Sequence, residues 1–466
     1  MKRTLIIDTT TSVGQEVTLK GWVDTKRDHG KLTFIDLRDR TGIVQCVGFQ
    51  KMGELTVESV VEIVGMVKER PEKMVNHDLP TGTVEVDVKE YIILNKAVEL
   101  PLQITTDGLE IGEETRLRYR YIDLRRSRMQ KIMRLRSNYF HAMRQALVNR
   151  GFVDIETPIL AKATMEGARD FIVPSRFQPG KFYALPQSPQ QYKQLLMTAG
   201  FEKYFQFAKC FRDEDLRADR GFEFTQLDLE MSFASRDEVM ETVEAVVKES
   251  VKAVGGKLQT EQFPVIDYRK ALEKYGADKF DLRTETEKQD GTLAFAWVVN
   301  FPMFKKVDAK DAAEVRDGKS GWTFTHNPFS SPKAEHIPWL MKGEHIENIL
   351  TDQYDLVCNG YEAGGGGIRA HKPEVLQATY RIMGYTDEEI QTSIGHMLEA
   401  FSFGTPPHGG IALGLDRHVM ILAGEESLKE AIAFPMTSTG RTAVMDAPSE
   451  VNKVQLEDLG LQVKKK

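Results

Sequence analysis

The sequence predicts an α+β protein in which a small all-β domain precedes a larger domain of helices and strands. Residues 1–105 contain five short β-prone segments, separated by turn signals such as Thr41-Gly42 and Pro80-Thr81-Gly82. From about residue 137 onward, helical and β-prone segments follow one another without a regular βαβ rhythm. Two of them, KYFQFAKCF and FEFTQLDLEMSF, flank a charged loop as an antiparallel pair, which favours α+β over a doubly wound sheet.

The five N-terminal segments have the length and spacing of strands in a small barrel. Five such strands are closed most economically as an OB-fold, whereas a β-sandwich would need about seven. The expected strands are EVTLKGWVD, KLTFIDLRD, GIVQCVGF, VVEIVGMVKER and TVEVDVKEYIIL.

Composition limits the class of protein. The chain has 466 residues, of which 41% are hydrophobic and 28% charged, as in ordinary soluble proteins. No apolar run approaches the ~20 residues of a membrane helix, and the N-terminus is too polar for a signal peptide. Cys46, Cys210 and Cys358 lie far apart without metal-ligand spacing. We therefore expect a cytoplasmic protein without membrane or DNA partners. With a net charge of −7, any RNA-binding surface must be a local patch.

The most basic segment of the chain is RLRYRYIDLRRSRMQKIMRLR, residues 116–136. Its second half shows helical apolar spacing that continues until Gly151. Individually, these arginines are typical of a solvated helix face. Together, beside the expected barrel, they form a candidate for contacting phosphates.

Polar residues on the expected barrel indicate nucleic-acid binding. Phe34 and Gln45 fall on neighbouring strands, where an aromatic ring could stack on a base for about 1–3 kcal/mol and an amide could read a base edge. Alone, Phe34 is more typical of a core than of a binding surface. Its combination with Arg27, Lys31 and Arg38 makes an RNA-binding face about as well supported as a core position.

In FRDEDLRADRGFEFTQLD, residues 211–228, the loop between the two arms holds Arg212, Arg217 and Arg220 beside four acids, with Lys209 nearby. One interpretation is a solvated hairpin tip with surface ion pairs, each worth about 0–1 kcal/mol. However, the arms of the hairpin are apolar and aromatic, which places the charges on a buried sheet. We therefore expect a functional loop.

Three further motifs carry candidate site residues. Ser188 and Pro189 begin an expected helix on which Gln190 and Lys193 share a face, with Glu166 in the preceding EGARDF. By themselves these residues also fit an ordinary capped helix.

Two glycine-rich segments follow. In YDLVCNGYEAGGGGIRAH, Asp355 and Glu362 could hold Mg²⁺ between phosphate oxygens, and Arg369 offers a planar fork for a carboxylate or phosphate. A flexible glycine loop would leave Glu362 and Arg369 unexplained. In PPHGGIALGLDRHVMIL, Arg417 stands at a helix start that favours anions. Arginines 212, 369 and 417 with two acids predict a polyphosphate and carboxylate site.

FRDEDLRADRGFEFTQLD, GLDRHVM and the proline after GFVDIET resemble the three signature motifs of class II aminoacyl-tRNA synthetases. EGARDF, LPQSPQ, NGYEAGGGGIR and PPHGGIALGLDR are similar to bacterial-type aspartyl-tRNA synthetases, and the resemblance covers nearly the whole chain. It implies an OB-fold anticodon-binding domain (1–105), a basic hinge (106–135), a class II catalytic domain with an antiparallel sheet flanked by helices (136–445) and a C-terminal extension (446–466). The implied activity forms aspartyl-adenylate from L-aspartate and ATP with Mg²⁺, then aspartylates the 3′ end of tRNA(Asp).

The resemblance also implies individual roles. Arg212 would contact the ATP α-phosphate and the substrate carboxylate, with Phe224 and Arg417 on either side of the adenine. The implied ATP-binding residues are Arg212, Asp213, Glu214, Gly221, Phe224, Glu362, Gly414, Leu415, Asp416 and Arg417, with Asp355 and Glu362 as metal ligands. The implied aspartate site comprises Glu166, Ser188, Gln190 and Asp228 at the amino end, Arg212, and Lys193, His326 and Arg369 at the side-chain carboxylate. Arg27, His29, Phe34 and Gln45 would read the anticodon, and Pro158 would lie in a homodimer interface.

The chain departs from the family pattern in several places. An inserted domain of the family is missing, since only residues 284–293 bridge its position. Gly221 stands in RGFEF where the family has RQPEF, and Asn327 replaces the second of two histidines. His29 is associated with enzymes that also charge tRNA(Asn), whereas Lys73 matches the strict enzymes. We expect relaxed specificity. The alternatives are a strict aspartyl enzyme, an asparaginyl-tRNA synthetase and a non-catalytic RNA-binding paralogue.

Overall fold

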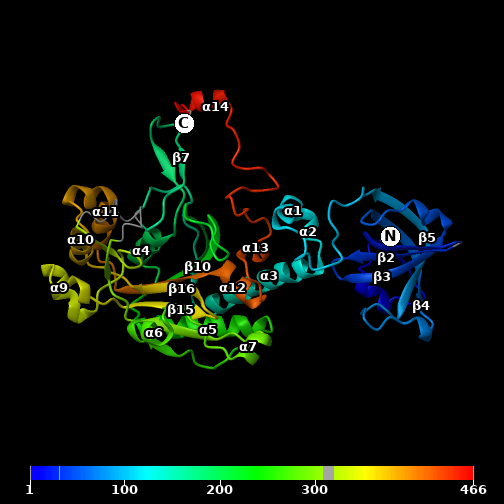
Figure 1. Ribbon diagram of the computed structural model, residues 1–466, viewed down its shortest axis with the longest axis horizontal. Coiled ribbons are helices and arrows are strands. Elements are labelled where there is room, and N and C mark those ends of the chain that lie inside the picture. The colour runs from blue at the N-terminus through cyan, green and yellow to red at the C-terminus, as the bar shows by residue number, and fades with distance from the viewer. Residues whose placement is uncertain (1, 31, 165, 308–319, 465–466) are drawn as a thin grey trace. The chain divides into compact units, whose positions relative to one another are not determined.

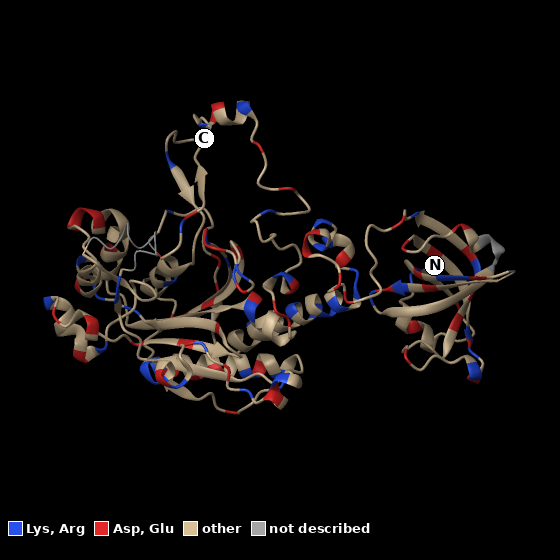
Figure 2. Cartoon of the chain, viewed as in Figure 1, with Lys and Arg blue, Asp and Glu red and all other residues tan. Residues whose placement is uncertain are grey.

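A computed structural model describes residues 2–30, 32–164, 166–307 and 320–464 of the chain (Figure 1). The chain divides into two compact units, Met1–Gln103 and Ile104–Lys466. Acidic and basic residues are interspersed along both units, as the modest net charge leads one to expect (Figure 2).

The first unit is a closed five-stranded barrel with the strand order β1-β2-β3-β5-β4. Alternation of buried and part-exposed residues along each strand sends one face into the barrel core, where Leu19, Ile35 and Val86 are fully buried. The predicted barrel is confirmed. Its strands are β1 (Glu16–His29), β2 (Leu32–Asp39), β3 (Gly42–Phe49), β4 (Val60–Glu69) and β5 (Val84–Asn95).

The second unit is built on an eight-stranded sheet with the order β11-β12-β15-β16-β17-β10-β9-β6. Its six inner strands pair antiparallel, whereas the edge pairs β11–β12 and β6–β9 are parallel, so the expected antiparallel sheet is in fact mixed at its edges. The strands are β6 (Val153–Asp154), β9 (Lys203–Phe211), β10 (Glu223–Ser232), β11 (Val265–Asp267), β12 (Phe295–Val299), β15 (Gln353–Cys358), β16 (Tyr361–Ile368) and β17 (His408–Gly414). Two small hairpins are β7 (Ile172–Pro174) with β8 (Phe182–Ala184), and β13 (Phe304–Lys306) with β14 (Trp322–Phe324).

Helices surround this sheet. Residues of α3, α5 and α12 form one apolar core with one face of the sheet, and α10 and α11 contribute to a second core. The helices are α1 (Glu113–Arg118), α2 (Arg120–Asp123), α3 (Ser127–Val148), α4 (Gln190–Thr198), α5 (Arg236–Ala253), α6 (Tyr268–Tyr275), α7 (Glu285–Gln289), α9 (Ile337–Lys342), α10 (Pro373–Ile382), α11 (Asp387–Ser402), α12 (Leu415–Leu422), α13 (Leu428–Ala431) and α14 (Lys453–Asp458). Among the described residues, no helix is long and apolar enough to cross a membrane.

The glycine run 364–367 is part of strand β16, and not a loop. Its position between β15 and β17 explains the residue type, because a β-carbon on Gly364 would lie 2.5 Å from the Leu413 side chain. A β-carbon on Gly366 would collide with the Gly410 carbonyl oxygen. The glycines therefore let neighbouring strands approach closely, and this packing aligns the residues at both ends of β16.

The basic segment is part of the second unit. Residues 106–135, expected as a basic hinge, include α1, α2 and the first turns of α3. Arg116, Arg120 and Arg126 are buried around Asp123. They are therefore neither a solvated helix face nor free to contact phosphates.

Candidate active site

Strand β10 has two chemically different faces. Leu227, Leu229 and Met231 enter the apolar core, whereas Asp228 and Glu230 point to the opposite face, which α4 covers. This alternation follows from the two-residue period of a strand. It places a row of buried acids under the helix that carries Lys193.

A cavity of about 200 Å³ opens beside the end of β10, between the charged loop, β16 and the start of α12. Arg212 and Phe224 face one another across the hairpin, with the guanidinium carbon 5.0 Å from the ring centroid. The Arg212 Nε donates to the Gln187 carbonyl oxygen at 3.3 Å. Eight residues predicted for ATP line this cavity: Arg212, Glu214, Gly221, Phe224, Glu362, Gly414, Asp416 and Arg417.

Arg417 is held by the charged loop. Its Nη2 donates to the Asp219 carbonyl oxygen at 3.0 Å and pairs with Asp219 Oδ2 at 3.2 Å, while Nη1 donates to the Glu362 carbonyl oxygen. Among the described residues, its buried Nε has no hydrogen-bond partner. Asp219, which sequence reasoning did not single out, thus orients a predicted ATP ligand.

The predicted metal ligands Asp355 and Glu362 lie on the neighbouring strands β15 and β16, where Asp355 is paired with Gly365 and Glu362 with Val357. A β-carbon at Gly365 would lie 3.2 Å from Asp355 Oδ1 and 3.5 Å from Glu362 Oε1, so both carboxylates border the same space. In the described part of the chain, no group of three or more potential ligands could hold a metal ion alone. A carboxylate pair that leaves room for substrate oxygens suits Mg²⁺.

The pKa values of the two carboxyls shift in opposite directions. Burial, helped by the charge of Glu362, raises the pKa of Asp355 well above its usual value. Burial alone would also raise the pKa of Glu362, but Lys279 and Arg417 bring it to about 2. The Lys279 Nζ lies 2.7 Å from Glu362 Oε2. Lys279, missed at the sequence level, therefore supplies positive charge where a metal ion would bind.

His326 lies with this carboxylate pair, its Nδ1 3.9 Å from Asp355 Oδ2. Its ring packs edge-on against Phe301, and burial lowers its pKa, which favours the neutral imidazole. These contacts place His326 beside Asp355, and its expected role with Lys193 and Arg369 at the aspartate side chain stays a prediction.

Lys193 and Arg369 meet two buried acids. The Lys193 Nζ lies 2.6 Å from Asp228 Oδ1 and 3.2 Å from Glu230 Oε2. Arg369 donates through Nε to Glu230 Oε1 at 2.9 Å, and through Nη2 to Glu230 Oε2 at 3.4 Å and the Gly410 carbonyl oxygen at 3.2 Å. All four side chains are at most 2% exposed. The hydrogen bonds of Arg369 to described residues thus run through Nε and Nη2.

The other end of this site holds carboxylate oxygens without partners. Ser188 donates to Glu166 Oε2 at 2.5 Å and accepts from the Gln190 backbone N–H at 3.2 Å. Within the described residues, Glu166 Oε1 and Asp228 Oδ2 are buried and unpaired. Burial raises the pKa of both Glu166 and Asp228. Two such oxygens are suited to a cationic donor group.

Three predicted ATP residues have their side chains committed to contacts within the protein. Asp213 pairs with Arg169 at 3.5 Å, and Leu415 is fully buried in the apolar core. Asp416 accepts from the Thr225 backbone N–H at 2.7 Å and pairs with Arg136 through its other oxygen. Asp416 therefore braces the cavity wall, with both oxygens bonded to the protein.

The outer face of the barrel carries the predicted anticodon residues. Phe34 is part-exposed, and His29 packs edge-on against it with the ring centroids 5.5 Å apart. Arg27 donates to Gln45 Oε1 and to Asp36, each at 3.3 Å. Gln45 in turn donates to Glu85 at 2.9 Å. These contacts bring all four predicted residues together beside an aromatic ring.

Two other predicted residues of the chain, Arg38 and Lys73, lie apart from these groups. Arg38 pairs with Glu58 at 2.8 Å, so its guanidinium is committed within the barrel. Lys73 is exposed in a short 3₁₀ turn, Glu72–Met74. Lys31 lies outside the described residues.

Residues 112–438 match the family model of tRNA synthetases class II (D, K and N), and residues 17–94 match an OB-fold nucleic acid binding domain. The chain belongs to the class II tRNA synthetases. The synthetase is thus an enzyme of the aminoacyl-tRNA ligase type.

Curated relatives cover almost the whole synthetase. An aspartate–tRNA ligase of Staphylococcus carnosus is 38% identical, with 97% of each chain covered. An aspartate–tRNA(Asp/Asn) ligase of Corynebacterium jeikeium is 37% identical over 98% of this chain and 96% of its own. These alignments extend over 574 and 582 positions, whereas the synthetase has 466 residues, so the relatives contain residues that it lacks.

Solved structures support the fold assignment. An asparaginyl-tRNA synthetase of Pyrococcus horikoshii with asparaginyl-adenylate superposes with a TM-score of 0.74 at 23% identity, covering 94% of the synthetase and 98% of that chain. An aspartyl-tRNA synthetase of Entamoeba histolytica gives 0.72 at 22% identity, covering 93% and 91%. At these identities the likeness shows the fold.

Proposed function

We propose that the synthetase activates L-aspartate with ATP and transfers the aspartyl group to the 3′ end of tRNA(Asp). The observation that carries this proposal is the buried group of Lys193, Arg369, Asp228 and Glu166. Its unpaired carboxylate oxygens suit the substrate ammonium, and its remaining N–H donors suit a second carboxylate.

The free donors favour aspartate over asparagine. Lys193 uses two ammonium hydrogens on Asp228 and Glu230, which leaves a third, and Arg369 keeps its Nη1 group. A side-chain carboxylate can accept from both donors. The amide of asparagine would turn its own N–H groups towards at least one of them, which leaves buried donors unsatisfied.

The neighbouring cavity is our proposed ATP site. Phe224 can stack on one face of the adenine with Arg417 on the other, and the charges of Arg212 and Arg417 can neutralise the phosphates and the attacking carboxylate. The substrate carboxylate attacks the α-phosphorus, and pyrophosphate leaves. Such a step needs alignment and charge neutralisation more than a nucleophilic side chain. Bound between Asp355 and Glu362, Mg²⁺ would supply further neutralisation of the phosphate oxygens.

We further propose that the barrel face binds the anticodon of tRNA(Asp) and also of tRNA(Asn). His29 is exposed and its ring lies against Phe34, so a base stacked on Phe34 would meet His29. The Corynebacterium relative is an aspartate–tRNA(Asp/Asn) ligase, which supports the broader scope. Lys73 is exposed and could contact the same RNA.

Replacing His29 by leucine is expected to abolish charging of tRNA(Asn) while charging of tRNA(Asp) is retained. Aminoacylation of separate tRNA(Asp) and tRNA(Asn) transcripts measures both. His77→Leu, at an exposed position of the same unit, is the matched control and should charge both RNAs. A wild-type enzyme that fails on tRNA(Asn) would contradict the broader scope.

Two remaining expectations stay proposals. Pro158 is exposed beside Ile159 and Leu160, which are 47% and 53% exposed, and this apolar surface next to edge strand β6 fits a homodimer interface. We also propose that the enzyme works without the inserted domain. Residues 284–293 form only α7 and a turn, and the chain then continues directly into β12. The cytoplasmic location stays a prediction.

A further inference from the structure

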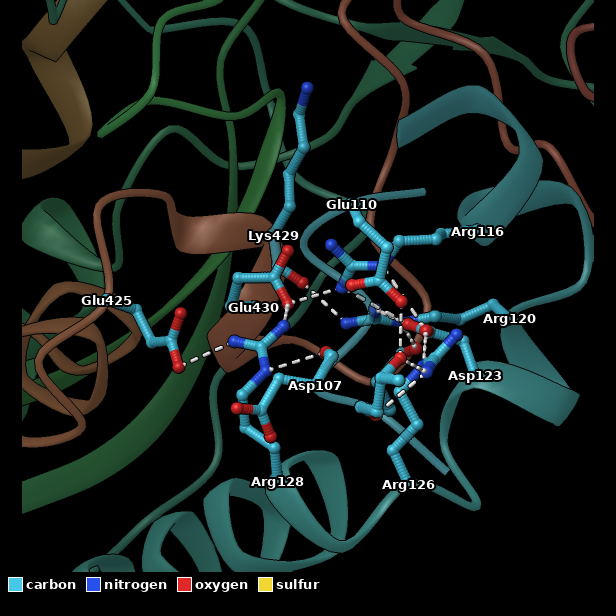
Figure 3. A network of polar contacts seen from close by, with 12 residues as sticks. Asp107, Glu110, Arg116, Arg120, Asp123, Arg126, Arg128, Glu425, Lys429 and Glu430 are labelled. Carbon is cyan, nitrogen blue, oxygen red and sulfur yellow. Dashed lines mark hydrogen bonds and ion pairs between the residues drawn. The ribbon is translucent and has the colours of Figure 1, made fainter. Parts of the chain in front are cut away.

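Asp123 is the centre of a buried ion-pair cluster, formed with Arg116, Arg120 and Arg126, which we call the Asp123 cluster (Figure 3). The shortest contacts from the Asp123 carboxylate are 2.6 Å to Arg120, 2.7 Å to Arg126 and 3.2 Å to Arg116. Asp123 and Arg126 are fully buried, and Arg120 is 1% exposed. Burial would raise the pKa of Asp123, but the arginines lower it.

A buried cluster of charges contributes little net free energy to folding. Removing several charges from water costs free energy that their mutual attraction repays only with good geometry, and apolar side chains of similar volume often serve stability as well. Fixing a particular geometry is the better-attested use of a buried ionic group. The contacts of Arg120 show which geometry is fixed.

Arg120 holds the C-terminal end of helix α13. Its Nη2 donates to the carbonyl oxygens of Lys429 at 2.7 Å and Ile432 at 3.0 Å, and its Nε donates to that of Ala433 at 3.0 Å. A helix of four residues is not stable by itself, and its last carbonyls need external donors. Arg120 supplies these donors, and Asp123 orients Arg120.

The other end of α13 supports the proposed ATP site. The Leu428 backbone N–H donates to the Ala218 carbonyl oxygen at 2.9 Å, within the charged loop, and Leu428 lines the 200 Å³ cavity. The next loop residue, Asp219, is the partner of Arg417. A continuous path of direct contacts therefore runs from Asp123 through Arg120, α13 and the loop to Arg417.

Side-chain charges hold the same helix at a second point. Glu430 Oε2 lies 2.7 Å from both Arg116 and Arg128, and Arg128 also pairs with Glu425 at 2.6 Å (Figure 3). Arg136 of α3 donates to the Ala431 carbonyl oxygen at 3.1 Å. These contacts give the short helix one defined position against α1–α3.

We propose that Arg120, oriented by Asp123, is a positioning residue for the binding of ATP. It sets the place of α13, which in turn sets the charged loop and the Asp219–Arg417 pair. Arg120 itself does not touch the substrates. The inference rests on the proposed assignment of ATP to the cavity beside Arg417.

The test is Arg120→Lys in the full-length chain, which keeps the charge but cannot donate to three carbonyl oxygens at once. Small displacements of positioning groups have large kinetic effects, so we expect KM for ATP in ATP–pyrophosphate exchange to rise about tenfold. KM for aspartate should change less than about twofold, because the Lys193–Arg369 group lies outside this path. Unchanged KM for ATP, or an equal rise in both constants, would overturn the proposal.

A destabilised control separates positioning from general damage. Ile394→Val, in the core formed by α10 and α11, lowers thermal stability without contacting the Asp123 cluster. It should leave KM for ATP unchanged, and a rise like that of Arg120→Lys would overturn the proposal. If Arg120→Lys does not fold, Glu430→Gln replaces it, because Glu430 is less buried and must likewise raise KM for ATP selectively.

Arg417→Ala distinguishes failure of this inference from failure of the site assignment. Normal exchange by Arg417→Ala would show that ATP does not bind in this cavity, which would overturn both the site assignment and the positioning role of Arg120. Impaired exchange by Arg417→Ala, with an unchanged KM for ATP in Arg120→Lys, would overturn the positioning role alone.

Discussion

Replacing Glu230 by alanine is expected to destabilise the catalytic unit by about 3–5 kcal/mol, the cost of leaving buried charges unpaired. Glu230 is fully buried and neutralises both Arg369 and Lys193. Burial alone would raise the pKa of Glu230, but Arg369 and Lys193 lower it below its usual value. Because the folded pKa is depressed, this carboxylate stabilises the fold above its unfolded pKa, and the contribution is lost as pH falls through the folded pKa.

Urea unfolding of the wild type and the Glu230→Ala variant at neutral pH measures this effect. Glu249→Ala is the matched control, since Glu249 also pairs with an arginine, Arg150, but is 55% exposed. Its loss should cost about 0–1 kcal/mol. If Glu230→Ala is no more destabilising than Glu249→Ala, the two buried cations do not depend on Glu230.

Replacing Arg417 by alanine is expected to lower kcat/KM for ATP–pyrophosphate exchange by about 10²–10³-fold, the usual effect of losing one fixed donor to a developing negative charge. Arg417 lines the proposed ATP cavity, and Asp219 and the Glu362 carbonyl oxygen hold its guanidinium in place. Its buried Nε has no partner among the described residues, which leaves a donor for a ligand.

Exchange kinetics under saturating aspartate measure the Arg417 effect. Arg381→Ala, which removes a 53% exposed arginine paired with Asp387, is the control and should retain wild-type exchange. A loss of less than about threefold in Arg417→Ala would show that this guanidinium does not contact the phosphates.

The fold was predictable where local patterns determine it. Turn residues separate the barrel strands, and alternation along them matches the observed β1–β5. The hairpin of β9 and β10 was expected from its apolar arms. The parallel edges β6 and β11 were not, because each is only two or three residues long and pairs through contacts distant in sequence. The burial of arginines in segment 116–136 was not predicted for a related reason, since Arg116 pairs with Glu430 and Arg120 donates to the Ala433 carbonyl oxygen, both far along the chain.

Prediction of the site depended on the same distinction. Family motifs placed Arg212, Phe224 and Arg417 around one cavity, and the structure brings them together there. Lys279 and Asp219 carry no local signal, because their importance comes from pairing with Glu362 and Arg417 across the fold. The sequence does indicate that Glu230 belongs to the site. Glu230 lies two residues after Asp228 on the same strand, so the two side chains must share one face of the sheet.

ATP–pyrophosphate exchange with L-aspartate or L-asparagine as the only amino acid tests the central claim most directly. The free donors of Lys193 and Arg369 predict exchange with aspartate and at least a hundredfold weaker exchange with asparagine, about the discrimination of a mismatched polar site. Exchange supported by asparagine but not by aspartate would contradict the proposed substrate. Absence of exchange with either amino acid would contradict the proposed activation of aspartate.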